Sequence, residues 1–241
     1  IGWQYSYVLC GIAGLLMIPV IVWLLPAQTR LANSETSLPI LTGLSNDRRL
    51  GDMLRDPFFF MMLPALMTPA ILETAMNFHQ LTIANMKGWS PEWVTGGYAI
   101  FAVMTVVFSM IAGDLADRIS AARLMPFGLL PLAAGVLVVA YFDHYIWAWV
   151  YLGFFGVSSG LMVTCIPLLL AEVYGTRHIG AIRSFAATVS VFGSALAPPM
   201  LGYGLDAEVS LHKMAIIGAL YVVIASLLMA YACHKENNRP K

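Results

Sequence analysis

Long apolar runs separated by short charged segments make up most of this chain. The runs predict seven membrane-spanning helices, at residues 3–25, 57–82, 91–112, 122–142, 146–172, 179–203 and 211–233. Each run is long enough for the roughly 30 Å hydrocarbon core of a bilayer, which takes about 20 residues of α-helix. Helices satisfy their own backbone hydrogen bonds in lipid. The pattern therefore predicts an all-α, polytopic membrane protein.

Composition agrees with a membrane protein and argues against a nucleic-acid-binding or metal-binding function. The 241 residues are 59% hydrophobic and 11% charged, whereas a soluble domain carries about 25% charged residues. The formal net charge is zero, so no nucleic-acid partner is suggested. Cys10, Cys165 and Cys233 lie in apolar runs without metal or disulfide spacing. The chain lacks an initiator Met and opens into a helix, so we expect a fragment of a longer protein.

The basic residues predict an orientation. Two of them, Lys87 and Lys213, fall on one side of the predicted topology. The others share the opposite side: Arg30, Arg48, Arg49, Arg55, Arg118, Arg123, Arg177, Arg183, Lys235, Arg239 and Lys241. Loops rich in Lys and Arg stay in the cytoplasm. We therefore expect a protein of the plasma (inner) membrane with a cytoplasmic C-terminus.

The one long connection, residues 26–56, is the predicted domain boundary. It contains prolines, glycines and mixed charges, and it lies on the basic, cytoplasmic side. Within it, residues 46–56 are expected to form a short surface helix with Leu50, Met53 and Leu54 toward the membrane. The chain then divides into a single helix at 1–25, a central loop at 26–56 and a six-helix part at 57–241.

A charged stretch, Gly113-Asp114-Leu115-Ala116-Asp117-Arg118 to Arg123, separates two apolar runs. A loop of about ten residues is too short to cross a bilayer, so the flanking helices form a hairpin. Gly113 is expected to permit close backbone approach, and Asp117 to cap a helix or pair with a cation. The stretch resembles the G-x-L-A-D-R-x-x-x-x-R signature of the major facilitator superfamily, with Ser120 where the family often has Gly.

The resemblance extends over the whole chain. Gly2-Trp3-Gln4-Tyr5 is similar to the start of family helix six, and Arg55-Asp56-Pro57 to the start of helix seven. The signature would then lie between family helices eight and nine. This implies seven transmembrane helices, six of them forming one half of a twelve-helix bundle. It also implies a secondary transporter of a small solute by alternating access, whose missing N-terminal half would be a partner.

Glu73 is the most informative single residue. It lies some 16 positions into the 57–82 helix, about 24 Å from its cytoplasmic end, where a carboxylate costs roughly 2.5–3.5 kcal/mol. Asn77 and Gln80 follow on the same helix face, and His79 lies at its edge. This polar stripe predicts a substrate or proton path. A buried acid suits proton coupling and equally suits binding of a cationic solute.

A second group of charges is predicted at the cytoplasmic edge. Glu172, Arg177 and Arg183 resemble the acidic-then-basic loop between family helices ten and eleven. With Asp117, Arg118 and Arg123 they are expected either to latch one conformation or to point into solvent without specific partners. Between Arg123 and Glu172 in the sequence, small residues predict close packing against a neighbouring helix; they are Gly153, Gly156 and Gly160.

Three alternatives to this interpretation remain. One is a more specific transporter, a monocarboxylate or organic-anion porter, although the six-helix part offers no Lys or Arg near the midplane. Another is a membrane-embedded enzyme with Glu73 and His79 as acid and base, which lie about 120° apart around the helix. The last is a non-transporting remnant. We find no catalytic or metal motif, and we expect no enzyme activity, cofactor or metal.

Overall fold

The computed structural model describes residues 48–237, together with the separate positions 12, 15, 16 and 19. The predicted helix at 3–25, most of the loop at 26–56 and the similarity at residues 2–5 lie outside the described residues. The chain divides into two units, 1–45 and 46–241, and residues 48–237 belong to the second.

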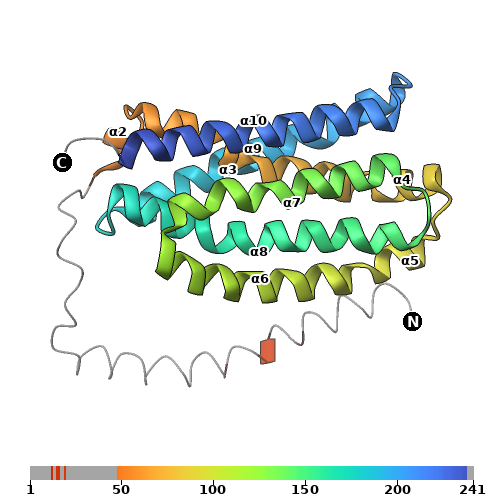
Figure 1. Ribbon diagram of the computed structural model, residues 1–241, viewed down its shortest axis with the longest axis horizontal. Coiled ribbons are helices and arrows are strands. Elements are labelled where there is room, and N and C mark those ends of the chain that lie inside the picture. The colour runs from red at the N-terminus through yellow and green to blue at the C-terminus, as the bar shows by residue number, and fades with distance from the viewer. Residues whose placement is uncertain (1–11, 13–14, 17–18, 20–47, 238–241) are drawn as a thin grey trace. The chain divides into compact units, whose positions relative to one another are not determined.

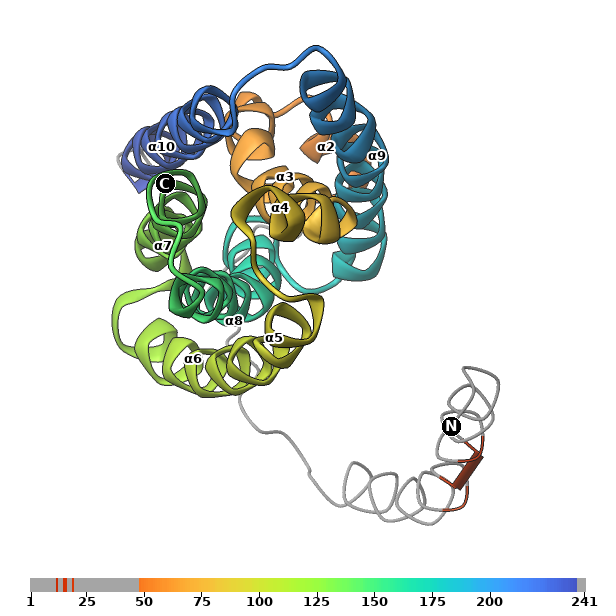
Figure 2. The same cartoon turned by 90° about the vertical axis from the view of Figure 1, so that its right-hand side faces the viewer.

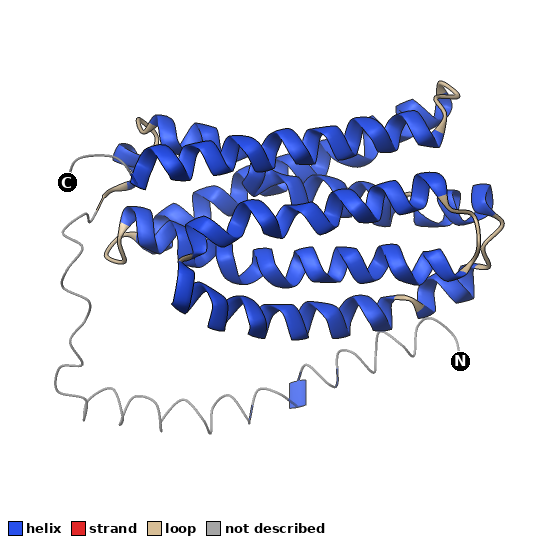
Figure 3. Ribbon diagram, in the orientation of Figure 1, coloured by secondary structure: helices blue, strands red, loops and turns tan. Residues whose placement is uncertain are grey.

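The described part of this unit is helical throughout, with no strand between residues 48 and 237 (Figures 1 and 3). The helices are α2 (Leu50–Met53), α3 (Pro57–Phe78), α4 (Gln80–Lys87), α5 (Pro91–Gly96), α6 (Tyr98–Ile119), α7 (Ala121–Tyr141), α8 (Ile146–Tyr174), α9 (Ile179–Asp206) and α10 (Leu211–Asn237). Among the described residues, six helical segments are long and apolar enough to cross a membrane. The prediction of an all-α polytopic membrane protein is confirmed.

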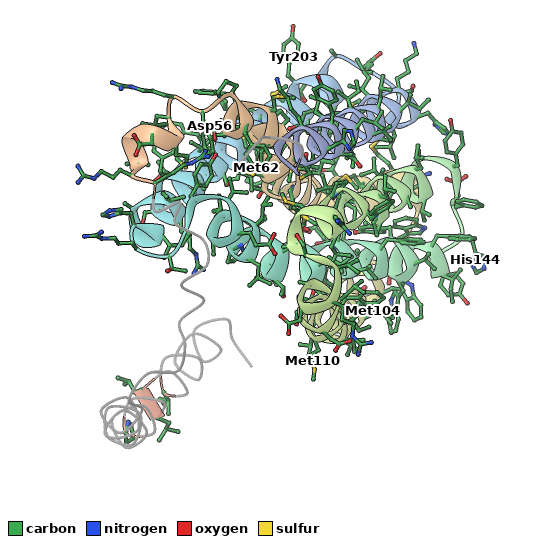
Figure 4. All side chains as sticks on the ribbon, turned by 60° about the vertical axis from the view of Figure 1, so that its left-hand side comes forward. Asp56, Met62, Met104, Met110, His144 and Tyr203 are labelled. Atoms are coloured by element: carbon green, nitrogen blue, oxygen red, sulfur yellow. The ribbon has the colours of Figure 1, made fainter. Side chains whose placement is uncertain are left out.

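The helices pack in an order different from their order in the chain. Neighbours in space run α6, α8, α7, α10, α3 and α9, and α9 also meets α8. Figure 2, which looks along the bundle, shows α3 and α4 lying between α9, α10 and α8. The most exposed spans are α6 and α9. Met110 of α6 and Tyr203 of α9 point outward from different sides of the bundle (Figure 4).

Glycines on α8 make the closest helix contact possible. A Cβ at Gly156 would lie 2.4 Å from the carbonyl oxygen of Phe101, and one at Gly160 would lie 2.5 Å from that of Thr105. Small residues let helix backbones approach where lipid provides little hydrophobic drive. The close packing predicted for these two glycines is confirmed, whereas a Cβ at Gly153 would meet only ordinary contact with Ile100.

The charged signature is not a loop. Helix α6 continues through Gly113, Asp117 and Arg118 to Ile119, so the prediction that this helix ends at residue 112 is wrong. Only Ser120, with φ 77° and ψ 142°, separates α6 from α7. Positive φ is a conformation that glycine adopts readily and other residues adopt rarely, so Ser120 has an uncommon backbone conformation.

The short helix α2 lies inside the segment expected to form a surface helix, but it faces the protein. Met53 is fully buried and joins the same apolar core as Met62. Asp56 then caps α3 by accepting from the backbone N–H of Phe58, and Arg48 donates to its carboxylate at 2.7 Å. Asp56 and Met62 are labelled in Figure 4. The expectation that Met53 faces the membrane is therefore wrong.

At the opposite end of the bundle, a lysine and two tryptophans form hydrogen bonds between the connecting segments. Lys87 donates to Asp143 at 2.5 Å and to the carbonyl oxygen of Ala140 at 3.2 Å. The indole N–H of Trp89 donates to the backbone oxygen of Asp143, and that of Trp93 to Tyr145. The hydrogen bond and positive charge of Lys87 lower the pKa of Asp143 below its ordinary value. These contacts tie the α4–α5 turn to the α7–α8 loop.

Candidate functional site

Glu73 of α3 is held by a serine on α8. The Ser159 hydroxyl donates to the Glu73 carboxyl oxygen over 2.5 Å, and both side chains are half-buried. Glu73 lies about 24 Å along α3 from its first residue, inside the segment able to span a membrane. The structure therefore gives this acid a polar partner within the bundle. Sequence reasoning did not single out Ser159, because a serine beside glycines is typical of helix packing.

Asn77 and Gln80 meet at one hydroxyl group. The Tyr98 hydroxyl at the start of α6 lies 2.8 Å from Asn77 Oδ1 and 2.8 Å from Gln80 Oε1. Asn77 is exposed, whereas Gln80 is half-buried and begins α4. The predicted stripe is thus divided into two polar contacts, Glu73 with α8 and the two amides with α6. Tyr98 was missed, since a tyrosine near a helix end usually signals only an interface anchor.

His79 lies elsewhere. Its backbone, at φ −94° and ψ 14°, separates α3 from α4, and its Nε2 is 2.9 Å from the carbonyl oxygen of Pro198 on α9. It lines a cavity of about 620 Å³ with Phe78, Ala195, Pro198, Pro199, Gly202, Tyr203 and Asp206. The structure therefore does not bring His79 together with Glu73, and the two side chains bond to different helices.

Glu172 caps a helix. Its carboxylate accepts from the Ser120 hydroxyl at 2.8 Å, from the backbone N–H of Ala121 at 3.0 Å and from that of Ala122 at 3.3 Å. A carboxylate at a helix N-terminus satisfies free N–H groups and complements the helix dipole. Glu172 at the end of α8 thus fixes the junction between α6 and α7.

The other predicted charges are not gathered around Glu172. Arg118 pairs with Asp114 one turn earlier at 3.1 Å, and both side chains are largely exposed. Within residues 48–237, the Asp117 side chain makes no hydrogen bond or ion pair, so the partner expected for it is not seen. Arg123, Arg177 and Arg183 are exposed at the same end of the bundle.

Gly113 also differs from its predicted role. A Cβ at this position would meet nothing within 4 Å among the described residues, so the close backbone approach expected there is not seen. The same part of the chain has no group of three His, Cys, Asp or Glu side chains placed to hold a metal ion. The remaining candidate chemistry is the acid–serine pair and the tyrosine–amide cluster.

Two comparisons bear on the origin of this arrangement. A sequence model of the Major Facilitator Superfamily matches residues 1–198. The chain is also similar to dipeptide and tripeptide permease A of Serratia proteamaculans (strain 568), with 32% identity over 57% of this chain and 28% of that protein. The protein of the same name from Yersinia pestis is 31% identical over 59% of this chain and 30% of its own length.

These matches span less than a third of the length of either relative, so the similarity concerns only a part of each permease. The superfamily match covers most of the chain and agrees with the apolar helices and with the charged signature at the α6–α7 junction. This chain belongs to the major facilitator superfamily.

Proposed function

We propose that this chain provides a six-helix half of a secondary transporter, which moves a small solute by alternating access and couples it to protons through Glu73. The observation that carries the proposal is the contact between Glu73 of α3 and Ser159 of α8, about 24 Å along α3 from its first residue. Superfamily membership supports the transporter class. Transporters of this kind hold their solute near the midplane between two halves, so the partner would be a second six-helix half.

The argument for proton coupling starts from the free energy of placing a charged carboxylate within the membrane. A charged carboxylate at membrane depth costs roughly 2.5–3.5 kcal/mol, and protonation removes the charge. A conformational change that opens Glu73 to water or closes it off would alter this cost and so alter its protonation. The Ser159 hydroxyl can donate to the carboxyl group in either protonation state, which lets the pair persist while the proton comes and goes.

For the solute, we favour a short peptide or a similar small zwitterion. Both relatives bear the name of dipeptide and tripeptide permeases, and an acid beside amide groups suits a molecule with an ammonium group and hydrogen-bonding carbonyls. An organic-anion porter is less well supported, because every Lys and Arg in the described helices lies at an end of the bundle. A midplane cation would have to come from another part of the transporter.

We also propose an orientation and a location. Eight basic residues of the described part lie at the end of the bundle with α2, the α6–α7 junction and the end of α10, namely Arg48, Arg49, Arg55, Arg118, Arg123, Arg177, Arg183 and Lys235 (Figure 1). Lys87 and Lys213 lie at the opposite end. By the positive-inside rule the basic end, with the C-terminus, would face the cytoplasm of a plasma (inner) membrane.

Uptake by reconstituted protein tests the proposal. We expect liposomes containing this chain together with its second half to accumulate labelled alanyl-alanine when the outside is made acidic, and to show only equilibration without a pH gradient. Glu73→Gln should abolish accumulation, because it keeps the shape of the side chain and removes the titrating group. The exposed acid Glu92 provides the matched control, Glu92→Gln, which should accumulate peptide normally. Normal accumulation by Glu73→Gln would contradict the role of Glu73.

A further inference from the structure

The Tyr98 hydroxyl faces two amide oxygens but has one proton to donate. The Tyr98 hydroxyl lies 2.8 Å from an oxygen of Asn77 and 2.8 Å from an oxygen of Gln80. A phenol has one proton and can donate to one of them only. Two acceptors cannot share a short contact without a proton between them, so one amide must present its NH₂ group to the tyrosine oxygen. This takes a half-turn about the last bond of that side chain.

Burial decides which amide turns. With its oxygen toward Tyr98, Gln80 has a buried Nε2 that finds no hydrogen-bond partner among the described residues. Two unsatisfied N–H bonds in an apolar site cost more than an oxygen left with a spare lone pair. Turning Gln80 makes Nε2 the donor to Tyr98 over the same 2.8 Å. Turning Asn77 instead would leave the buried Gln80 donor unsatisfied.

The cluster lies against a buried aromatic core, against which Tyr98 also packs. Tyr151 of α8 is 3% exposed, stacks on Trp89 and meets Phe155 edge to face. With Gln80 turned, the hydrogen bonds run in one direction, from Gln80 through Tyr98 to Asn77.

We propose that this directed chain fixes the amide of Asn77 with its oxygen toward Tyr98 and its NH₂ group toward the solute, so that the site selects solutes carrying a hydrogen-bond acceptor. The acceptor would be a carbonyl or carboxylate oxygen. Asn77 is exposed and its Nδ2 makes no hydrogen bond within the described residues. Tyr98 acts here as a positioning residue.

With Glu73, the site has two binding groups, a carboxyl group and the Asn77 N–H donor. Glu73 precedes Asn77 by one turn on the same face of α3, which places their Cβ atoms about 6 Å apart. An acid at one point and a fixed N–H donor one turn away match a solute with an ammonium or N–H group near an acceptor oxygen. A short peptide has this pattern and a simple diamine lacks the acceptor. This part of the inference rests on the proposed function.

The first test needs no solute. Hydrogen exchange of side-chain amides, followed by NMR of ¹⁵N-labelled protein, should show Asn77 exchanging fast and Gln80 exchanging at least about tenfold more slowly, the factor for roughly one hydrogen bond. Tyr98→Phe should speed exchange at Gln80 and leave Asn77 fast. Tyr221 also donates to α3, at the backbone oxygen of Pro64, so Tyr221→Phe is a matched control that should change neither. An Asn77 amide that exchanges slowly in the wild-type protein would overturn the proposed orientation.

The second test compares two probes by calorimetry. Alanyl-alanine carries acceptor oxygens, whereas cadaverine carries ammonium groups alone. We expect Tyr98→Phe to weaken alanyl-alanine binding about tenfold without changing that of cadaverine, and Asn77→Asp to weaken alanyl-alanine and strengthen cadaverine. Equal losses for both probes would overturn the selective role of Asn77. If the wild-type protein binds neither probe, the proposed peptide solute fails and so does this selectivity, while the exchange measurement still decides the orientation of the amides.

Discussion

At the scale of single residues, the polar side chains of α3 and the start of α4 each contact a hydroxyl group on another helix. Glu73, Asn77 and Gln80 were predicted to line one path because each is costly in lipid. The structure gives each a polar contact, but through Ser159 and Tyr98, residue types common in helix interfaces. His79 was grouped with them by periodicity. The helix breaks at His79 itself, and its ring turns to Pro198 of α9.

The ion pair of Asp143 with Lys87 predicts an effect of pH on stability. Lys87 lowers the pKa of Asp143 in the folded protein below its ordinary value of 3.8. The folded state then binds the proton less tightly than the unfolded state, so the pair stabilises fully above about pH 4 and is lost as pH falls through the lowered pKa. The melting temperature in detergent should fall on acidification from about pH 6 to about pH 3, and less so in Asp143→Asn.

Because Asp143 is exposed, this effect should be small. The control is Asp206→Asn, which removes an exposed carboxyl group at the same end of the bundle without touching Lys87. Its acid sensitivity should match that of the wild-type protein. Identical pH profiles for Asp143→Asn and the wild-type protein would show that the contact with Lys87 contributes nothing measurable to folding.

At the scale of helices, hydrophobic length predicted the spans to within a few residues, except where a charged or special residue lies inside a helix. The α6 helix continues seven residues past its predicted end, because Asp114 and Arg118 pair along its surface and do not break it. The junction depends instead on the backbone of Ser120, at φ 77°, and on a carboxylate from α8. A contact 52 residues away in the chain cannot be recognised from local sequence.

This contact predicts that Glu172 matters more for stability than the signature acid Asp117. Glu172→Ala removes the acceptor for Ser120 and for two backbone N–H groups, which should cost about 1 kcal/mol, as for other helix caps. Glu172→Gln keeps one acceptor oxygen and should lose less. Unfolding by denaturant in mixed micelles measures both. Asp117→Asn, which touches no described partner, should be near neutral. An equal or larger loss for Asp117→Asn would contradict this assignment.

At the scale of the whole molecule, the distribution of charge was predictable and its cause is simple. Basic residues are costly to move across a membrane, and eight of the ten in residues 48–237 lie at one end of the bundle. The order in which the helices pack was not predictable, since it depends on glycine contacts such as Gly156 with Phe101. The expected seventh helix and the boundary at residues 26–56 remain predictions.

The charge distribution predicts which end is accessible from outside the cell. Arg123→Cys lies at the basic end and Glu92→Cys at the other, and both positions are exposed. An impermeant thiol reagent added to intact cells should label Glu92→Cys and leave Arg123→Cys unlabelled until the membrane is opened. The reverse pattern would overturn the proposed orientation.

The central claim, that Glu73 carries a proton during transport, is tested most directly by measuring the proton itself. Liposomes that contain this chain together with its second half, and a trapped pH-sensitive dye, receive alanyl-alanine outside, with no imposed gradient. The account predicts that inward movement of peptide acidifies the interior with the wild-type protein and with Glu92→Gln, and causes no acidification with Glu73→Gln. Acidification by Glu73→Gln equal to that of the wild-type protein would contradict the account.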